Sequence, residues 1–145
     1  MAYSMTFLYD AHGNRQTTAT GAYTYWSGKP FHLKTASGIP GDMGYDANGN
    51  LISGPGVALE YTPENMMKKS TAAGVVTLFS YDADQWRAYK LNQTTGVKSF
   101  FVRGLGNQVL SEWTNLNSST ADVRDYIYAG GRLVAVQTAS NMPAR

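Results

Sequence analysis

The sequence contains no cysteine, so disulfide bonds and thiolate metal sites are excluded, although the cellular compartment is not fixed by this absence. Histidine is nearly absent as well, because His12 and His32 are the only two. A histidine-rich metal site or a Ser–His–Asp constellation would have to be built from very few residues. Gly104 and Gly106 lack the third glycine of a dinucleotide-binding loop. We therefore expect no metal and no cofactor.

Charged residues are also scarce, at 15% of the chain, and the net charge is only +2. The longest basic run is Lys68-Lys69, which is too little for the electrostatic footprint of a nucleic-acid-binding protein. The first five residues include no basic segment, and no long apolar stretch follows them. We expect no nucleic-acid partner, no signal peptide and no membrane insertion, and the localisation stays open.

Helical periodicity is missing too, because no segment places apolar residues at i, i+3, i+4 and i+7 over three turns. The chain instead has ten tyrosines and fifteen glycines, which suit many short strands joined by turns. Its length and its 43% hydrophobic content are sufficient for one domain with a substantial core. These features predict an all-β protein.

One short segment is repeated along the chain. Tyr45-Asp46-Ala47-Asn48-Gly49-Asn50-Leu51 has counterparts that begin at Tyr9-Asp10 and Tyr81-Asp82, each 36 residues away. A weaker series with the same spacing begins at Tyr25 and Tyr61. The tyrosines therefore advance by alternating 16 and 20 residues, and each step is long enough for one β-hairpin.

The residues of this segment are those that a tight turn requires. Asp46 can accept a hydrogen bond from its own backbone two residues on, and Gly49 permits the positive φ that closes the turn. Asn65 can take the place of that glycine because asparagine tolerates the left-handed conformation. Gln85 does so less readily, so the third copy is expected to turn differently or under strain.

These units resemble the YD-repeat or Rhs-type proteins, whose repeats read roughly Tyr-Asp-x-x-Gly followed by Asn or Arg and then Leu or Arg. Two further segments look like the family's terminal repeats, Phe100 to Asn107 and Asp125 to Val136, although both depart from the pattern. Arg103 stands where Asp is expected, and Ala129 follows Tyr128. The residues that carry the resemblance are Tyr9, Asp10, Gly13, Asn14, Arg15, Tyr45, Asp46, Gly49, Asn50, Leu51, Tyr81, Asp82 and Arg87.

The resemblance implies tandem hairpins in a curved or spiralling antiparallel sheet, which in large relatives looks like the wall of a shell around a C-terminal toxin or effector. It also implies a bacterial protein whose relatives are exported or lie at the cell surface, where such repeats mediate contacts between cells. This chain would supply the C-terminal part of a repeat region. The family's self-cleavage segment is not recognisable, so no autoproteolytic function is expected.

The alternation of residues predicts about seven hairpins over residues 1–137, forming a single repeat domain, with a frayed tail over 138–145. Residues 114–120 are polar and read as a loop. The expected strand pairs are Tyr3 to Tyr9 with Gln16 to Thr20, Ala22 to Tyr25 with Phe31 to Lys34, the central repeat, Ala58 to Tyr61 with Met66 to Lys69, Val75 to Tyr81 with Trp86 to Asn92, Val97 to Val102 with Gln108 to Trp113, and Val123 to Tyr128 with Arg132 to Gln137.

Asp10, Asp46 and Asp82 are the obvious candidates for acid–base or metal chemistry, yet all three occupy the same turn position. A residue that recurs in every copy serves what every copy needs, so we interpret them as turn-forming. The segment after Asp46 is no calcium loop, because Val57 stands where a bidentate Glu is required. Asp10 and His12 are the one candidate catalytic pair, and they would make the protein a small hydrolase. The sequence favours a protein that is not an enzyme.

The aromatic residues allow a second alternative, a carbohydrate-binding module in which flat rings stack on sugars. Trp26 and Trp86 are the candidates for this role because they fall at turns, where a packed core is thinner. The other candidates are interpreted mainly as core residues. They are Tyr23, Tyr25, Tyr89 and Trp113.

The ends of such an array predict association. Edge strands near Tyr3 to Phe7 and near Val134 to Val136 would present unpaired N–H and C=O groups with few charges to protect them. An isolated spiral would also bury its aromatic face poorly. We expect a homo-oligomer through these edges, or else closure of the sheet as a barrel. A polypeptide cargo or a carbohydrate is the other expected partner.

Overall fold

The computed structural model describes residues 6–18, 21–115 and 120–143, and throughout this part of the chain the regular structure is β-strand, with no helix. The predicted all-β class is therefore confirmed. The chain divides into two compact units, Met1–Asn65 and Met66–Arg145, and the single repeat domain over 1–137 stays a prediction. In a repeat array each hairpin packs on its neighbours along the chain, so such an array separates readily into smaller compact groups.

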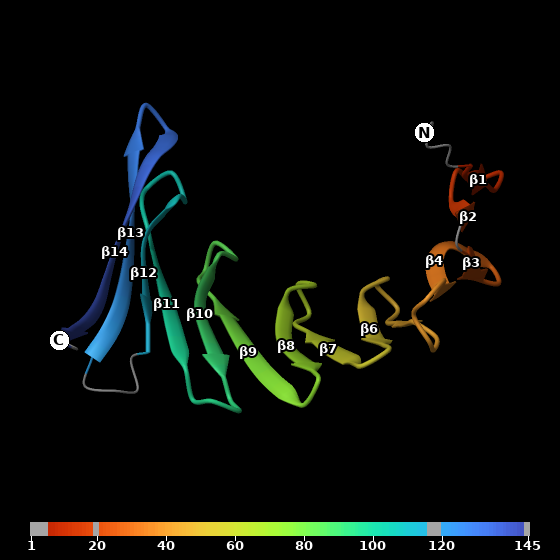
Figure 1. The fold of residues 1–145 in the computed structure, drawn as a ribbon, viewed down its shortest axis with the longest axis horizontal. Helices are drawn as coiled ribbons and strands as arrows, with labels where there is room; N and C mark the ends of the chain where they lie inside the picture. Colours follow the sequence, from red (N-terminus) through yellow and green to blue (C-terminus); the bar gives the residue numbers. More distant parts are fainter. Residues whose placement is uncertain (1–5, 19–20, 116–119, 144–145) are drawn as a thin grey trace, which may run out of the picture. The chain divides into compact units, whose positions relative to one another are not determined.

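In the first unit the described residues form seven strands. Strands β1 to β4 pair in sequence order as a four-stranded sheet, and β5, β6 and β7 pair antiparallel in the same way (Figure 1). The strands are β1 (Leu8–Tyr9), β2 (Arg15–Thr18), β3 (Gly21–Trp26), β4 (Lys29–Ala36), β5 (Gly44–Tyr45), β6 (Leu51–Gly54) and β7 (Val57–Tyr61).

The part of the second unit that the structure describes also forms seven strands, and in Figure 1 they lie side by side in chain order. Each pairs antiparallel with the next, so alternate turns lie at the same end of the sheet. Among the described strands β14 pairs only with β13, so the sheet is open and does not close as a barrel. The strands are β8 (Met67–Ala72), β9 (Val75–Tyr81), β10 (Arg87–Asn92), β11 (Lys98–Arg103), β12 (Val109–Thr114), β13 (Thr120–Ala129) and β14 (Arg132–Pro143).

Most strands lie within a residue or two of their predicted bounds, and the ends of the chain differ most. Strand β14 continues to Pro143, where a frayed tail was predicted from residue 138. It does so because β13 begins at Thr120, earlier than predicted, and Thr120 pairs with Pro143. Near the start, Tyr3 and Met5 lie outside the described residues, as do residues 116–119 of the predicted loop. Of the strand predicted over Tyr3 to Tyr9, the described part is in a strand only at Leu8–Tyr9.

Burial is slight throughout the described residues. The buried apolar side chains are Ala36, Ala121 and Val123, and no large side chain is fully buried. The substantial core that the composition indicated is therefore absent from this part of the chain. A single sheet has no second layer against which to bury either face. The expectation that an isolated array buries its aromatic face poorly agrees with this result.

Candidate functional site

The turn at Asp46 is held by its carboxylate. Oδ1 accepts hydrogen bonds from the N–H groups of Asn48 (2.9 Å) and Asn50 (2.8 Å), and Oδ2 accepts one from Nδ2 of Asn50 (2.9 Å). The main chain closes the loop, since the N–H of Gly49 donates to the Asp46 carbonyl at 3.2 Å. Gly49 has the predicted left-handed φ, +88°. The carboxylate therefore satisfies backbone donors inside its own turn.

Asp10 and Asp82 build the same turn. Oδ1 of Asp10 accepts the N–H groups of His12 (2.8 Å) and Asn14 (2.9 Å). Oδ1 of Asp82 accepts those of Asp84 (3.1 Å) and Trp86 (2.8 Å).

Gln85 occupies the position that glycine holds in the other two turns, with φ of 65°. The third copy thus keeps the common geometry and places glutamine in the left-handed region. Of the two outcomes expected for this copy, a different turn or a strained one, the structure has the strained one.

Two more segments adopt this turn without an aspartate. The N–H of Asn65 donates to the Thr62 carbonyl (3.0 Å), and that of Asn107 donates to the Gly104 carbonyl (2.9 Å). Both asparagines have positive φ, 63° and 61°. The Asp position of the copy within Phe100 to Asn107 is therefore Gly104, and the sequence comparison that placed Arg103 there was wrong by one residue.

Hydrogen bonding also sets the protonation of two of these carboxyls. The side-chain amide of Asn50 lowers the pKa of Asp46 from 3.8, and the amide of Asn14 does the same for Asp10. Backbone N–H donors add to both effects. Both groups are thus held as carboxylates whose oxygens are already engaged, which suits a structural role better than proton transfer.

The repeat tyrosines bond the backbone of the preceding strand. The Tyr45 hydroxyl donates to the Leu33 carbonyl (3.0 Å), and the Tyr25 hydroxyl donates to the Arg15 carbonyl (2.9 Å). In the second unit Tyr81 donates to the carbonyl of Met67 (2.8 Å). The sequence predicted an aromatic face but missed this hydroxyl role, which its spacing alone does not reveal.

The Asp10 and His12 pair does not form a catalytic dyad in this geometry. Their hydrogen bond runs from the main-chain N–H of His12, while the imidazole lies edge-on to the Phe31 ring with 6.0 Å between centroids. His32 lies against Tyr45 at 4.6 Å. Among the described residues, no group of three or more His, Asp or Glu side chains is placed to hold a metal ion.

Trp26 lines a cleft of about 290 Å³ in the first unit. Its indole N–H donates to the Met43 carbonyl at 2.7 Å, and Nζ of Lys34 lies 4.7 Å from the ring centroid. Trp26 is 37% exposed. The other residues that line this cleft are Ser27, Lys29, His32, Gly44 and Tyr45.

Trp86 lies in the second unit just before β10 and is 42% exposed. The guanidinium of Arg103 lies 5.2 Å from its ring centroid. Each tryptophan proposed for sugar stacking therefore carries a cation near its ring, an arrangement that stabilises the pair by about 0.5–1 kcal/mol at exposed sites.

A groove of about 410 Å³ crosses β10 to β14 in the second unit. It combines cations from β10 and β11 with tyrosines from β13. The repeat pattern alone did not reveal this groove, because its residues come together only through the pairing of β10 to β14. Its lining consists of Arg87, Lys90, Phe101, Arg103, Val109, Glu112, Tyr126, Tyr128 and Leu133.

No helix in the described residues has the length and hydropathy needed to cross a membrane. Comparison of the chain with models of known protein families gave no match, and comparison with curated proteins gave none either.

Proposed function

We propose that this chain is a non-catalytic β-hairpin repeat segment that serves as a piece of wall, joined to further repeats or to other copies. The observation that carries the proposal is the turn shared by Asp10, Asp46 and Asp82, with Thr62 and Gly104 opening two further copies. The aspartates that a catalytic site would need are instead used, copy after copy, to hold the backbone.

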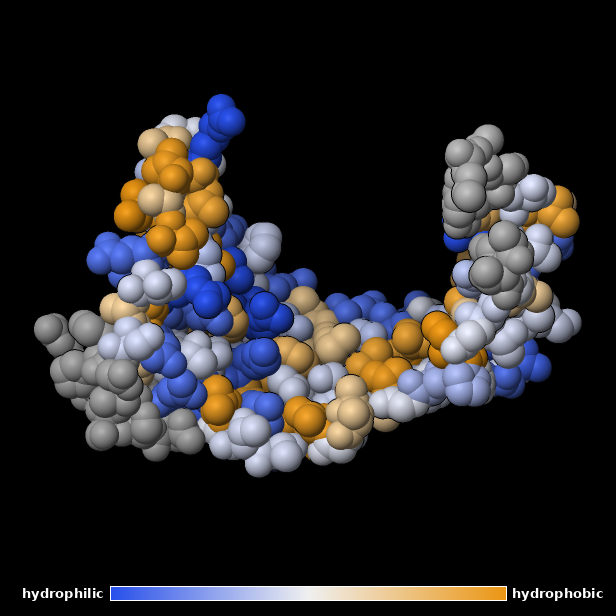
Figure 2. Space-filling view, in the orientation of Figure 1, coloured by the Kyte–Doolittle hydropathy of each residue, from blue (hydrophilic) through white to orange (hydrophobic). Residues whose placement is uncertain are grey.

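The lack of a deep core supports the same role. Apolar side chains such as Leu133 and Val134 are 51% and 60% exposed. Figure 2 shows apolar side chains gathered toward the tip of the β13–β14 hairpin. A surface of this kind is suited to contact with another layer of protein, since a domain ordinarily packs at least two layers around its core.

The resemblance to YD-repeat and Rhs-type proteins agrees with this role. In that family the sheet encloses a toxin or mediates contact between cells, at the bacterial surface or after export. We propose the same kind of role here, with a polypeptide cargo as the enclosed partner. The proposal rests on the repeated amino-acid pattern together with the geometry of the turns.

The experiment is to lengthen the array by one unit. A second copy of residues 46–81 is inserted between Tyr81 and Asp82 in the full chain. Because each unit contacts mainly its neighbours, we expect a folded protein with unchanged strand content per residue by circular dichroism. The urea m-value should rise, since it follows the surface exposed on unfolding.

A scrambled version of the inserted segment, placed at the same point, is the control. It should unfold the array locally and lower the strand content per residue. If the true repeat lowers the strand content as the scrambled one does, the fold does not accept an additional repeat, and the wall role is wrong.

The carbohydrate alternative has less support, because cations already lie near both tryptophan rings. Binding to a glycan array that is lost in Trp26→Ala or Trp86→Ala would support the carbohydrate-binding alternative. The hydrolase alternative predicts turnover that His12→Ala abolishes at unchanged thermal stability.

A further inference from the structure

The groove on the second unit concentrates positive charge. Arg87 and Lys90 come from β10, Arg103 comes from β11, and the lining includes one acidic residue, Glu112. That is three cations in one groove, in a chain whose whole net charge is +2. In Figure 2 hydrophilic residues gather beside the apolar cluster of the β13–β14 hairpin.

The single carboxylate is already engaged. Oε2 of Glu112 lies 3.5 Å from Nη1 of Arg124 and accepts a hydrogen bond from the Tyr126 hydroxyl at 3.3 Å. This one carboxylate, which also faces Arg124, does not balance the three cations on β10 and β11.

Those cations have no acidic partner among the described residues. Arg103 donates from Nη1 to the Asn107 carbonyl (2.8 Å) and from Nη2 to the Arg87 carbonyl (3.4 Å), both of them uncharged acceptors. Its Nε is buried without a hydrogen-bond partner. Arg87 contacts aromatic rings, at 4.9 Å from the Phe101 centroid. Lys90 is exposed on β10.

The rings of the groove decide what kind of anion fits. Arg87 lies over Phe101, and Arg103 lies over Trp86, so guanidinium groups already cover these ring faces. Of these two rings only Phe101 lines the groove, beside Tyr126 and Tyr128, so a sugar or a nucleic-acid base, which binds largely by stacking on open aromatic faces, would find the Phe101 face already covered by Arg87. An acidic polypeptide needs no stacking, because its carboxylates pair with guanidinium and ammonium groups directly.

We propose that this groove binds an acidic polypeptide segment of another chain in an extended conformation. The carboxylates of the segment pair with Arg87, Lys90 and Arg103, and its apolar side chains contact Val109, Leu133 and Tyr128. On an extended chain, alternate side chains point to the same face, so one face can carry the carboxylates while the other is free to carry apolar side chains. The site is independent of the wall role.

The test is a binding titration with the full chain. The probe is a fluorescent peptide of about ten residues with alternating Glu and Tyr, long enough to cross several strands. We expect saturable binding that weakens as salt is raised from about 0.05 M to about 0.5 M, because exposed charge pairs are screened. A peptide with Gln in place of Glu should not bind.

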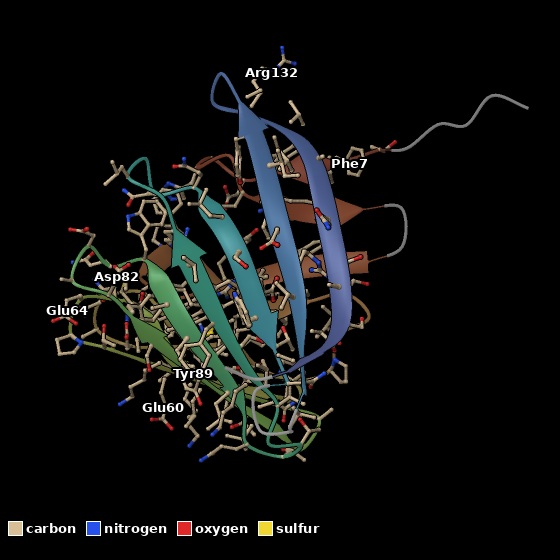
Figure 3. The ribbon with its side chains drawn as sticks, turned by 90° about the vertical axis from the view of Figure 1, so that its left-hand side faces the viewer. Phe7, Glu60, Glu64, Asp82, Tyr89 and Arg132 are labelled. Carbon is tan, nitrogen blue, oxygen red and sulfur yellow. The ribbon has the colours of Figure 1, made fainter. Side chains whose placement is uncertain are left out.

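Two variants of equal charge locate the site. Lys90→Gln removes a groove cation and should weaken binding about two- to fivefold, as expected for one exposed charge pair. Arg132→Gln removes a cation at the tip of the β13–β14 hairpin, outside the lining (Figure 3), and should leave binding unchanged. Thermal melts of both variants check that the fold is intact.

The proposal is overturned if the Gln peptide binds equally well, if Lys90→Gln binds like the parent protein, or if no saturable binding appears. It is also overturned if a polyuronate or a single-stranded oligonucleotide binds in a Lys90-dependent manner while the acidic peptide does not. None of these results would alter the outcome of the repeat-insertion experiment.

Discussion

The hydroxyl of Tyr81 donates a 2.8 Å hydrogen bond to the main-chain carbonyl of Met67 on the neighbouring strand. One strand pair further on, Nη2 of Arg103 lies 3.4 Å from the carbonyl of Arg87 and takes the same position relative to its turn. A side-chain donor at the end of one strand thus binds the backbone at the start of its neighbour. The donor need not be a tyrosine.

We predict that Tyr81→Phe lowers the free energy of unfolding by about 1 kcal/mol, which is typical for the loss of one hydrogen bond. Urea denaturation followed by circular dichroism measures the change. Tyr89→Phe is the matched control, because Tyr89 packs against Phe100 with 4.7 Å between ring centroids and no hydrogen bond from its hydroxyl is present in the described part of the chain. Equal effects from the two changes would show that the Tyr81 bond contributes nothing.

Gln85→Gly should stabilise the protein, by up to about 1 kcal/mol. Its φ of 65° is costly for a residue with a Cβ atom, and glycine removes that cost while adding some entropy to the unfolded chain. Differential scanning calorimetry should show a higher melting temperature.

Ala83→Gly in the same turn is the control for Gln85→Gly. Ala83 does not have a positive φ, so glycine there brings only the entropic penalty and should destabilise the protein. A lower melting temperature for both variants would mean that Gln85 is not strained.

Gly49→Val should destabilise the protein by more than about 1 kcal/mol, since a β-branched residue is forced into the left-handed region. Steric space is not the cause, because a Cβ at this position would lie 3.5 Å from Nε2 of His32, an ordinary contact. Gly49→Asn should recover much of the loss, as Asn65 does in its own turn. A neutral Gly49→Val variant would contradict the turn geometry.

Asp46 links stability to pH. Its pKa is lower in the folded protein than the ordinary 3.8, so folding favours the carboxylate. Its contribution is fully present above the unfolded value and is lost as the pH falls through the folded value, in the region below about pH 4. NMR titration of the side-chain carboxyl carbon should give a midpoint below 3.8 in the parent protein and a higher midpoint in Asn50→Ala. Identical midpoints would show that the Asn50 amide is not the cause.

Strand β14 leads us to expect association. It pairs only with β13 among the described strands, and Val134 and Val136 are 60% and 46% exposed. Light scattering at micromolar concentration should report a dimer or larger species, and the double change Val134→Lys and Val136→Lys should shift it toward the 15.8 kDa monomer, because charges protect edge strands. A parent protein that is monomeric throughout would refute this expectation.

The turns could be predicted from the sequence because their chemistry is local. Asp46 and Gly49 act within five residues, and such short-range rules fix both the turn and the strands beside it. The length of β14 could not be predicted, since Ala139 is in a strand only because Val123 lies opposite it. The two strands are joined by a tight turn at Gly130-Gly131, but the point at which their pairing stops, far from that turn, leaves no pattern in either segment alone.

The groove was also invisible in the sequence. Arg87 and Arg103 stand 16 residues apart and meet only because β10 and β11 are adjacent in register, with Tyr89 opposite Phe100. The aromatic residues beside these arginines are interpreted from the sequence as core residues or as a surface for sugar stacking, because the positions of the guanidinium groups are not evident there. The repeat pattern includes Arg87 and Arg103, but it does not show that strand pairing brings them into one groove with residues of β12, β13 and β14.

Arg103 and Gly104 replace the Tyr-Asp pair of the other copies, yet their turn has the same main-chain bonds. A consensus written in letters, Tyr-Asp-x-x-Gly, matches only the copies at Tyr9 and Tyr45. A consensus defined by geometry has three parts: a side-chain donor, a closed four-residue turn, and a fourth residue in the left-handed region. This consensus also describes the copies at Tyr81 and Arg103. The amino acids of such a unit can therefore change while its backbone geometry stays the same. A search for repeats by sequence identity alone will miss such units.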